Sequence, residues 1–362
     1  MAELKKPLSY KGQLKRLKVD HNLKIDNDDA ATKILKRVNY YRLSAYGLGL
    51  MQEDDKEKYR DGITLEHIFR LYTFDSRLRS ILFPAIEKLE IQLRAQISNH
   101  LAMTYGADGY TYPSNFTDKA TKDGKTVHEK IMEDFRREIN HQGDAPFVRH
   151  HMERYEGRFP AWVAVELFTF GNLASIYSIM KPDDRKAIAD LYNTDPKYLG
   201  SWMLSLVEIR NICAHYGRLY NMPLKQAPAL YREHRIYRQE GKATKLFQAL
   251  LAMKRVFDSD ARWKSVKTEL EALIEEYADV VNLSFIDFPE NWKDVRGAAK
   301  LPARGAFFSA RSGDLRGGLF CVQIGHRFIF QSWFRLPSHS FDPEGMGYRE
   351  SSSRQCARTV PP

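Results

Sequence analysis

Residues 64–106 of this chain read TLEHIFRLYTFDSRLRSILFPAIEKLEIQLRAQISNHLAMTYG and decide its fold class. Leucine and isoleucine recur at three- and four-residue steps from Leu65 to Ile97, which is the period of an amphipathic α-helix. Thr64 can cap the start of this helix, and Gly106 marks its end. Pro84 lies inside the pattern and is expected to kink the helix. The stretch therefore predicts one long helix with a buried face.

The rest of the chain before residue 296 carries the same period. Residues 107–126 are an exception, since they are rich in Gly, Thr, Asp and Tyr, have no period and are predicted to form a loop. Strand alternation is nearly absent, so the fold is predicted to be all-α, a helical bundle. Further helical patterns occupy residues 9–19, 28–47, 127–141, 161–180, 183–193, 197–216 and 241–280.

Three regions are predicted along the chain. Residues 1–60 form an N-terminal helical region, residues 61–295 a helical domain and residues 296–362 a tail. The tail loses the helical period and holds 8 of the 21 glycines. This composition is typical of disordered segments, although short apolar runs such as 321–324 interrupt it. We interpret the tail as sequence added after the functional unit.

Composition limits the cellular setting and the kinds of site. The net charge is +10, of which the tail contributes +6, so the body is only mildly basic and any RNA affinity must come from a local groove. No apolar stretch reaches the roughly 18 residues of a membrane span, and the N-terminus lacks the core of a signal peptide, so a cytoplasmic protein without membrane contact is expected. Cys213, Cys321 and Cys356 are too scattered for a disulfide framework or a zinc site.

A second stretch of the sequence contains two candidate catalytic residues. Residues 208–218 read EIRNICAHYGR and place Arg210 five residues before His215. A guanidinium can grip a phosphate while remaining charged, and an imidazole can move protons near neutral pH. Phosphodiester cleavage needs both abilities, so this pair suggests a nuclease.

The spacing Arg-x4-His alone is weak evidence because it occurs three times. Arg16/His21 and Arg136/His141 share it, but both lie in segments that read as charged helix surface or loop. Only Arg210/His215 follows an apolar stripe, which runs from Leu199 to Cys213. The two side chains point about 140° apart in a straight helix, so they converge only if the helix unwinds near His215 or a second element brings the phosphate between them. Tyr216-Gly217 offers a helix stop.

The segment Arg-Asn-x3-His resembles the signature of HEPN ribonucleases, and other blocks resemble the Abi-like (AbiD/AbiF) branch of abortive-infection proteins directed against phage. The resemblance spans roughly residues 8–295. The blocks, in family order, are NYYRLSAY at 39–46, LYTFDSRLR at 71–79, IEKLE at 86–90 with Arg94, and PAWV at 160–163 with Glu166 and FG at 170–171.

This resemblance implies a HEPN-like bundle that cuts RNA. Arg210 and His215 would be catalytic, and Asn211 would fix the histidine or the phosphate. No metal or cofactor is expected, because the 2′-hydroxyl of RNA is itself the nucleophile. One motif supplies one histidine, so a homodimer would provide both base and acid. Similarity to RNA-guided type VI CRISPR ribonucleases makes a small noncoding RNA a second expected partner. The expected substrate-binding residues are Tyr216, Arg218, Tyr220, Asn221, Arg94 and Glu166.

Plainer interpretations exist for each feature. Arg210 and His215 could be a surface pair, and Tyr40, Tyr41 and Tyr46 read more as the rim of the core than as RNA-stacking residues. Glu87, Glu90 and Arg94 fall on one helical side, where ion pairs could simply steady the helix. Cys213 reads as a buried small residue rather than a nucleophile. Two other functions stay open: a non-catalytic RNA-binding module of a phage-defence ribonucleoprotein, and a helical protein-interaction factor that senses phage.

Overall fold

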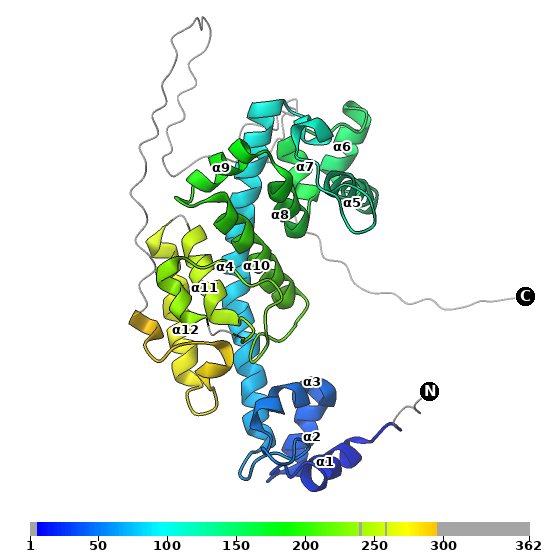
Figure 1. Cartoon of the computed structure of the whole chain (residues 1–362). Coiled ribbons are helices and arrows are strands. Elements are labelled where there is room, and N and C mark those ends of the chain that lie inside the picture. Colours follow the sequence, from blue (N-terminus) through cyan, green and yellow to red (C-terminus); the bar gives the residue numbers. More distant parts are fainter. Residues whose placement is uncertain (1–5, 239–240, 258, 295–362) are drawn as a thin grey trace, which may run out of the picture. The chain divides into compact units, whose positions relative to one another are not determined.

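The computed structural model describes residues 6–238, 241–257 and 259–294. Throughout these ranges the fold is all-α, as predicted: the chain forms α- and 3₁₀-helices, and only isolated β-bridges occur (Figure 1). All the described residues fall in one compact unit. The boundary predicted at residue 60 stays a prediction. The predicted tail, residues 296–362, lies outside the described residues.

Twelve α-helices and six short 3₁₀-helices follow one another along the described chain. The α-helices are α1 (Tyr10–Val19), α2 (Asp28–Arg37), α3 (Tyr40–Ser44), α4 (Leu65–Tyr105), α5 (Val127–His141), α6 (Pro146–Arg154), α7 (Ala161–Leu167), α8 (Phe170–Ile179), α9 (Pro182–Asp190), α10 (Pro196–Ala214), α11 (Leu246–Val256) and α12 (Asp260–Glu276). The 3₁₀-helices are η1 (Ala45–Leu50), η2 (Gly109–Thr111), η3 (Pro113–Asn115), η4 (Arg232–Tyr237), η5 (Leu283–Ile286) and η6 (Trp292–Asp294).

Helix α4 is the long helix that the opening stretch predicts. The hydroxyl of Thr64 accepts a hydrogen bond from the backbone N–H of His67 at 3.0 Å and caps its start. Gly106 ends it with φ +88°, a conformation that glycine adopts without strain. The helix continues through Pro84, which is exposed. Proline has no backbone N–H, so the carbonyl of Ser80, four residues earlier, receives no helical hydrogen bond from it. The predicted kink at Pro84 remains a prediction.

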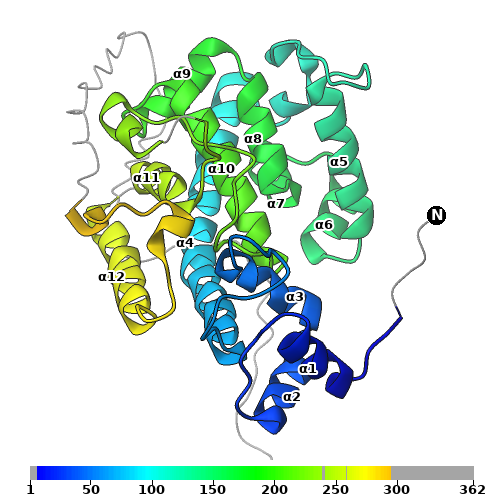
Figure 2. The ribbon, with the colours of Figure 1, turned by 60° about the horizontal axis from the view of Figure 1, so that its bottom comes forward.

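Helix α10 packs along α4 in the opposite direction (Figures 1 and 2). As the chain moves from Arg210 to Leu219, its partners on α4 move back from Glu90 to Asp75. Trp202, Leu206 and Ile209 are almost completely buried, which confirms the apolar stripe predicted for this helix. The antiparallel pair brings the end of α10 to the N-terminal half of α4.

Three predicted helices are in fact divided, because capping residues inside them start new helices. Asn39 caps α3, Thr169 forms a capping box with Asn172 at α8, and Ser259 caps α12. Helix α6 was not predicted at all. It begins at Pro146, a residue that favours the first turn of a helix.

Candidate functional site

Helix α10 ends one residue before His215, which is its C-cap residue with φ −99° and ψ 18°. The N–H of Tyr216 donates to the carbonyl of Cys213 at 3.2 Å. The N–H of Gly217 donates to the carbonyl of Ile212 at 2.7 Å. These two bonds form a Schellman motif, the common way to close a helix. The predicted helix stop is therefore confirmed, and His215 lies exposed at the point where the chain leaves the helix.

The residue that follows the histidine has an unusual backbone. Tyr216 adopts the left-handed conformation, with φ +54°, that glycine normally takes at this position of a Schellman motif. Its side chain is 71% exposed, so burial of the ring does little to offset the strain. The next residue is glycine, and a Cβ there would be crowded, because it would lie 3.0 Å from Cγ2 of Ile212 and 3.2 Å from its carbonyl oxygen.

Arg210 is held by a carboxylate on the neighbouring helix. Its Nε lies 3.3 Å from Oε2 of Glu90, whose side chain is only 8% exposed. Its Nη1 lies 3.4 Å from Oδ1 of Asn211, which is at the long limit of a hydrogen bond. These are its contacts to side chains in the described part of the chain. A guanidinium has five N–H donors, so donors remain for an anion.

Glu90 forms ion pairs with two arginines, Arg94 and Arg210. Its Oε1 lies 2.5 Å from Nη2 of Arg94, one turn later on α4, and Arg94 also donates to the backbone carbonyl of Val165 on α7. One carboxylate between two guanidinium groups leaves one positive charge in excess. Because Glu90 is buried, this excess is less screened than a charge in water and favours a bound phosphate.

Two of the expected substrate-binding residues, Arg94 and Glu166, differ in their exposure and their contacts. Arg94 is 13% exposed and is engaged with Glu90, so it orients the carboxylate that holds Arg210. Glu166 follows Val165 on α7 and is exposed. The pairing of Glu90 with Arg94 confirms the ion pair that their four-residue spacing predicts.

Asp75 on α4 anchors the segment after the histidine. Its Oδ1 accepts hydrogen bonds from the backbone N–H groups of Leu219 at 3.0 Å and Tyr220 at 2.8 Å. Its Oδ2 accepts one from the hydroxyl of Tyr46 at 2.7 Å and is paired with Arg79. Burial raises the pKa of the Asp75 carboxyl, and the Arg79 guanidinium acts against that rise. Both carboxylate oxygens are thus committed to holding the fold.

Two arginines also grip the backbone next to His215. Nη1 of Arg79 donates to the carbonyl of Gly217 at 2.9 Å, and Nη1 of Arg42 donates to the carbonyl of Tyr216 at 2.5 Å. Arg42 belongs to α3, which lies next to the C-terminal end of α10 (Figure 2). The position of His215 therefore depends on α3 and α4 as well as on its own helix.

The four residues after His215 that were expected to bind RNA fall into different settings. Tyr216 is exposed, whereas Tyr220 is 1% exposed and cannot stack on a base. The hydroxyl of Tyr220 exchanges hydrogen bonds with the backbone of Asn282, and burial raises its pKa to about 12. The expectation of RNA stacking on Tyr220 is therefore wrong, because the aromatic ring is part of the core.

Arg218 and Asn221 are both partly exposed. Arg218 donates to the carbonyl of Ala45, and its guanidinium lies 5.9 Å from the centre of the Tyr46 ring. Asn221 has φ +52°, and its Oδ1 accepts a hydrogen bond from Nζ of Lys245 at 3.2 Å. Each has a structural contact, and each retains a partly exposed side chain.

The other arginine-histidine pairs occupy ordinary surroundings. Nε of Arg16 lies 3.4 Å from Nε2 of His21, whose other ring nitrogen is 2.7 Å from a backbone carbonyl. Arg94 precedes His100 by six residues, a spacing that the sequence favours less than that of Arg210 and His215. Nε2 of His100 lies 2.8 Å from Oδ1 of Asp184, and Oδ2 of Asp184 accepts a hydrogen bond from the Tyr105 hydroxyl. The rings of His21 and His100 thus have hydrogen-bond partners within the fold, which give each histidine a structural role.

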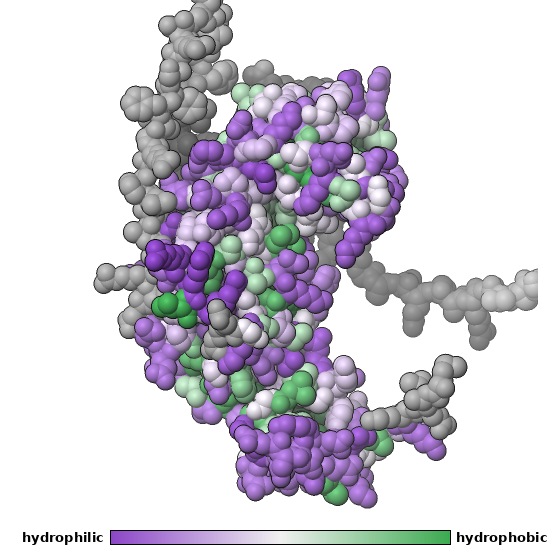
Figure 3. All heavy atoms as spheres, in the orientation of Figure 1, coloured by the Kyte–Doolittle hydropathy of each residue, from purple (hydrophilic) through white to green (hydrophobic). Residues whose placement is uncertain are grey.

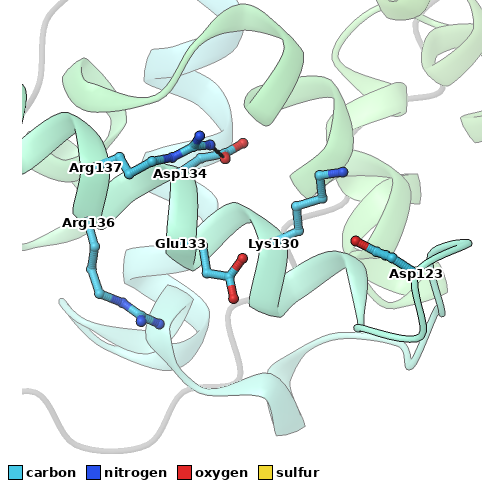
Figure 4. A pocket seen from close by; sticks show the side chains of 6 residues that line it. All are labelled: Asp123, Lys130, Glu133, Asp134, Arg136 and Arg137. Carbon is cyan, nitrogen blue, oxygen red and sulfur yellow. Dashed lines mark hydrogen bonds and ion pairs between the residues drawn. The ribbon is translucent and has the colours of Figure 1, made fainter.

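The pair Arg136/His141 lies on α5, and Arg136 lines an open hollow of about 470 Å³. Figure 4 shows the charged side chains that line it, with Asp134 and Arg137 joined as an ion pair and Arg136 extending away from them. Acidic and basic groups alternate there, so the hollow has no clear preference for an anion. The lining residues are Asp123, Lys130, Glu133, Asp134, Arg136 and Arg137.

Cys213 is buried and unpaired, and burial raises its pKa to about 12, so the thiol is not a nucleophile at neutral pH. Searches of the described residues find no cluster of three or more histidine, cysteine or acidic side chains that could hold a metal ion. The same residues contain no helix with the length and apolarity that spanning a bilayer requires. Hydrophilic residues cover most of the face drawn in Figure 3.

Three positions around the motif were not recognised from the sequence. Glu90 was considered only as a helix-steadying residue, and Asp75 and Arg79 appeared only within a family block. The four-residue spacing of Asp75 and Arg79 is a detectable signal for an ion pair on one helix. Nothing in the sequence shows that these groups meet residues 210–220.

Comparisons with known proteins identify the family but offer no near relative. No curated protein and no solved structure matches the chain. The family model described as "Abi-like protein" matches residues 33–221, which is more than half of the chain and includes α3, α4 and the whole of α10 with the segment that follows it. This chain therefore belongs to the Abi-like protein family.

Proposed function

We propose that this protein is an abortive-infection effector that cuts RNA through Arg210 and His215. Family membership suggests the abortive-infection role. The observation that supports cleavage is the setting of Arg210: its Nε is fixed by buried Glu90 and its guanidinium is about one-third exposed, five residues before a histidine exposed at a helix end.

The reaction uses only groups of the RNA and the protein. His215 accepts the proton of a 2′-hydroxyl, whose oxygen attacks the adjacent phosphorus. Arg210 binds the phosphate and stabilises the charge on its equatorial oxygens. The bond to the 5′-oxygen breaks, and this oxygen takes a proton, so the products are a 2′,3′-cyclic phosphate and a 5′-hydroxyl. Asn211 is proposed to help fix the phosphate, from its place beside the guanidinium.

The leaving oxygen needs an acid that one motif does not supply. Among the described residues, the His215 ring has no hydrogen-bond partner that could act as this acid or hold the ring for the role. We propose that a second copy completes the site in a homodimer and provides the other histidine. The exposed Tyr216, Arg218, Asn221 and Glu166 are proposed to contact the RNA around it, with Arg94 acting through Glu90.

The test is induced expression of single variants in a bacterial host. His215→Ala is expected to lower cleavage about 10²- to 10⁴-fold, the usual contribution of a general acid or base. Arg210→Ala is expected to lower it about 10²- to 10³-fold, the usual contribution of a group that stabilises charge in the transition state, and both variants should relieve growth arrest. Arg136→Ala and His141→Ala are the matched controls, because that pair has the same spacing. Sequencing of RNA 5′-hydroxyl ends measures cleavage directly, and circular dichroism checks that each variant is folded.

Three outcomes would contradict the proposal. If the control variants relieved arrest and the motif variants did not, the wrong pair would have been chosen. If RNA copurified with the protein but was never cut, and arrest persisted in His215→Ala, the chain would be a non-catalytic RNA-binding module. Cleavage that stops on chelation would exclude the metal-independent reaction.

A further inference from the structure

Two tyrosines near the end of α10 are unusually exposed. Tyr41 is 84% exposed and Tyr216 is 71% exposed. The neighbouring tyrosines of the N-terminal cluster differ, since Tyr40 is partly buried and the Tyr46 ring is 3% exposed, with its hydroxyl bonded to Asp75. Tyr46 and Tyr40 therefore serve the core, as the sequence suggested, and Tyr41 does not.

The two exposed tyrosines belong to segments that touch each other, although 174 positions separate Arg42 from Tyr216. Arg42, next to Tyr41 on α3, donates to the backbone carbonyl of Tyr216 at 2.5 Å. Arg218 donates in the reverse direction to the carbonyl of Ala45. Both tyrosines thus border the place where His215 is exposed.

The backbone at Tyr216 keeps a large side chain at a position where glycine would cost less. A residue other than glycine in the left-handed conformation costs about 1–2 kcal/mol, and strain of this kind is often found at functional sites. An exposed ring recovers little of that cost by packing. Tyr41 is likewise a large ring almost wholly in water, on a five-residue helix whose N-cap is Asn39.

The surrounding charge favours a polyanion. Arg42 is exposed, and Arg210 and Arg218 are partly exposed. Two acidic groups that contact this region are buried and paired, Asp75 with Arg79 and Glu90 with Arg94 and Arg210. The exposed and partly exposed charges named here are therefore those of arginines, which suit phosphates better than an uncharged protein surface.

We propose that Tyr41 and Tyr216 form a platform on which unpaired RNA bases stack, next to the phosphate held by Arg210. Bases stack on exposed aromatic rings in single-stranded RNA, while the bases of a duplex are already stacked on each other. The substrate class is then single-stranded RNA or a loop. This inference rests on the proposed function, because it uses the same site.

The test measures binding without cleavage. In the His215→Ala background, a fluorescent single-stranded RNA oligonucleotide is titrated with protein, and the same strand annealed to its complement serves as the duplex probe. Tyr41→Ala and Tyr216→Ala are each expected to weaken single-strand binding about 5- to 150-fold, which corresponds to the usual contribution of one stacked base. Tyr41→Phe should bind like the parent, since the ring and not the hydroxyl stacks.

Tyr112→Ala is the matched control, because Tyr112 is 51% exposed but lies in the loop between α4 and α5. It should leave binding unchanged. The proposal is overturned if the parent binds no single strand, if it prefers the duplex, or if the two alanine variants bind as the parent does. It is also overturned if those variants retain RNA affinity and instead split a dimer by analytical ultracentrifugation, since the tyrosines would then be a protein interface.

Failure here and failure of the proposed function are separable. If Arg210→Ala and His215→Ala abolish cleavage while the tyrosine variants bind normally, only the stacking platform is wrong. If the motif variants still cut RNA but Tyr41→Ala and Tyr216→Ala lose binding, the platform stands and the catalytic assignment is wrong.

Discussion

Tyr216→Gly should make the protein more stable. The native residue has φ +54° at a helix end where glycine is the favoured residue. The substitution removes the steric conflict between Cβ and the backbone, and the Schellman hydrogen bonds can stay in place because they use only backbone atoms. The ring is 71% exposed, so little packing is lost.

The expected magnitude is a difference of two effects. Relief of left-handed strain contributes about 1–2 kcal/mol, and the greater freedom of glycine in the unfolded chain costs about 0.5–1 kcal/mol. The free energy of unfolding should therefore rise by about 0–1.5 kcal/mol, with a midpoint of about 0.75 kcal/mol. For a unit of this size, a rise of about 1 kcal/mol corresponds to an increase of about 2–4 °C in Tm.

The assay is urea unfolding followed by circular dichroism, with two controls. Tyr216→Ala removes the ring but keeps a Cβ at positive φ, so it should not gain stability. Asn221→Gly changes another residue at positive φ, but asparagine tolerates this conformation and Asn221 also bonds Lys245, so its gain should be near zero or negative. A loss of stability in Tyr216→Gly, or an equal gain in Tyr216→Ala, would refute the argument from backbone strain.

Three further predictions concern the buried network, the oligomer and the tail. Arg79→Met should lower the free energy of unfolding by about 3–5 kcal/mol at pH 7, because the buried Asp75 charge loses its partner. The control Arg77→Met breaks an exposed ion pair with Glu276 and should lower it by less than about 1 kcal/mol. Without the guanidinium the pKa of Asp75 rises further, so the deficit of Arg79→Met should shrink as the pH falls from 7 towards 5 in the same urea series and should not grow. Excess His215→Ala chains should inhibit wild-type cleavage beyond simple dilution, and purely proportional dilution in a cleavage assay would exclude a shared dimeric site. Removal of residues 297–362 should leave thermal unfolding nearly unchanged, and loss of folded protein on truncation would contradict this.

The fold could be predicted well because helix period is a local property. The bounds of α1, α4, α5 and α10 follow the apolar stripes to within one or two residues. The divided helices could not be predicted from period alone, since apolar residues continue across Phe168-Thr169 and a side-chain cap decides where the new helix starts. Capping residues are a local signal too, and greater weight on them would have found these breaks.

The site was less predictable because its contacts are distant in sequence. The apolar stripe before them distinguished Arg210 and His215 from the other pairs with the same spacing, but Glu90 meets Arg210 across 120 positions. Tyr220 shows the reverse error: its place after the motif suggested contact with RNA, and only the packing against Asn282 and Phe285 shows that it is buried. Exposure depends on tertiary contacts that residue order does not contain.

Residues 217–220, which follow His215, are attached to α4 by hydrogen bonds, and this attachment limits when the site can form during protein synthesis. Arg79 and Gly217 are 138 positions apart, so α4 leaves the ribosome long before the residues that it must hold. At roughly 5–20 residues per second, the interval is about 7–30 seconds. Until the end of α10 and residues 217–220 have emerged, the carbonyl and N–H groups that Arg79 and Asp75 bind do not exist as partners. A nascent chain therefore cannot position its histidine, and any activity that depends on that position begins only after most of the family-matched region has been translated.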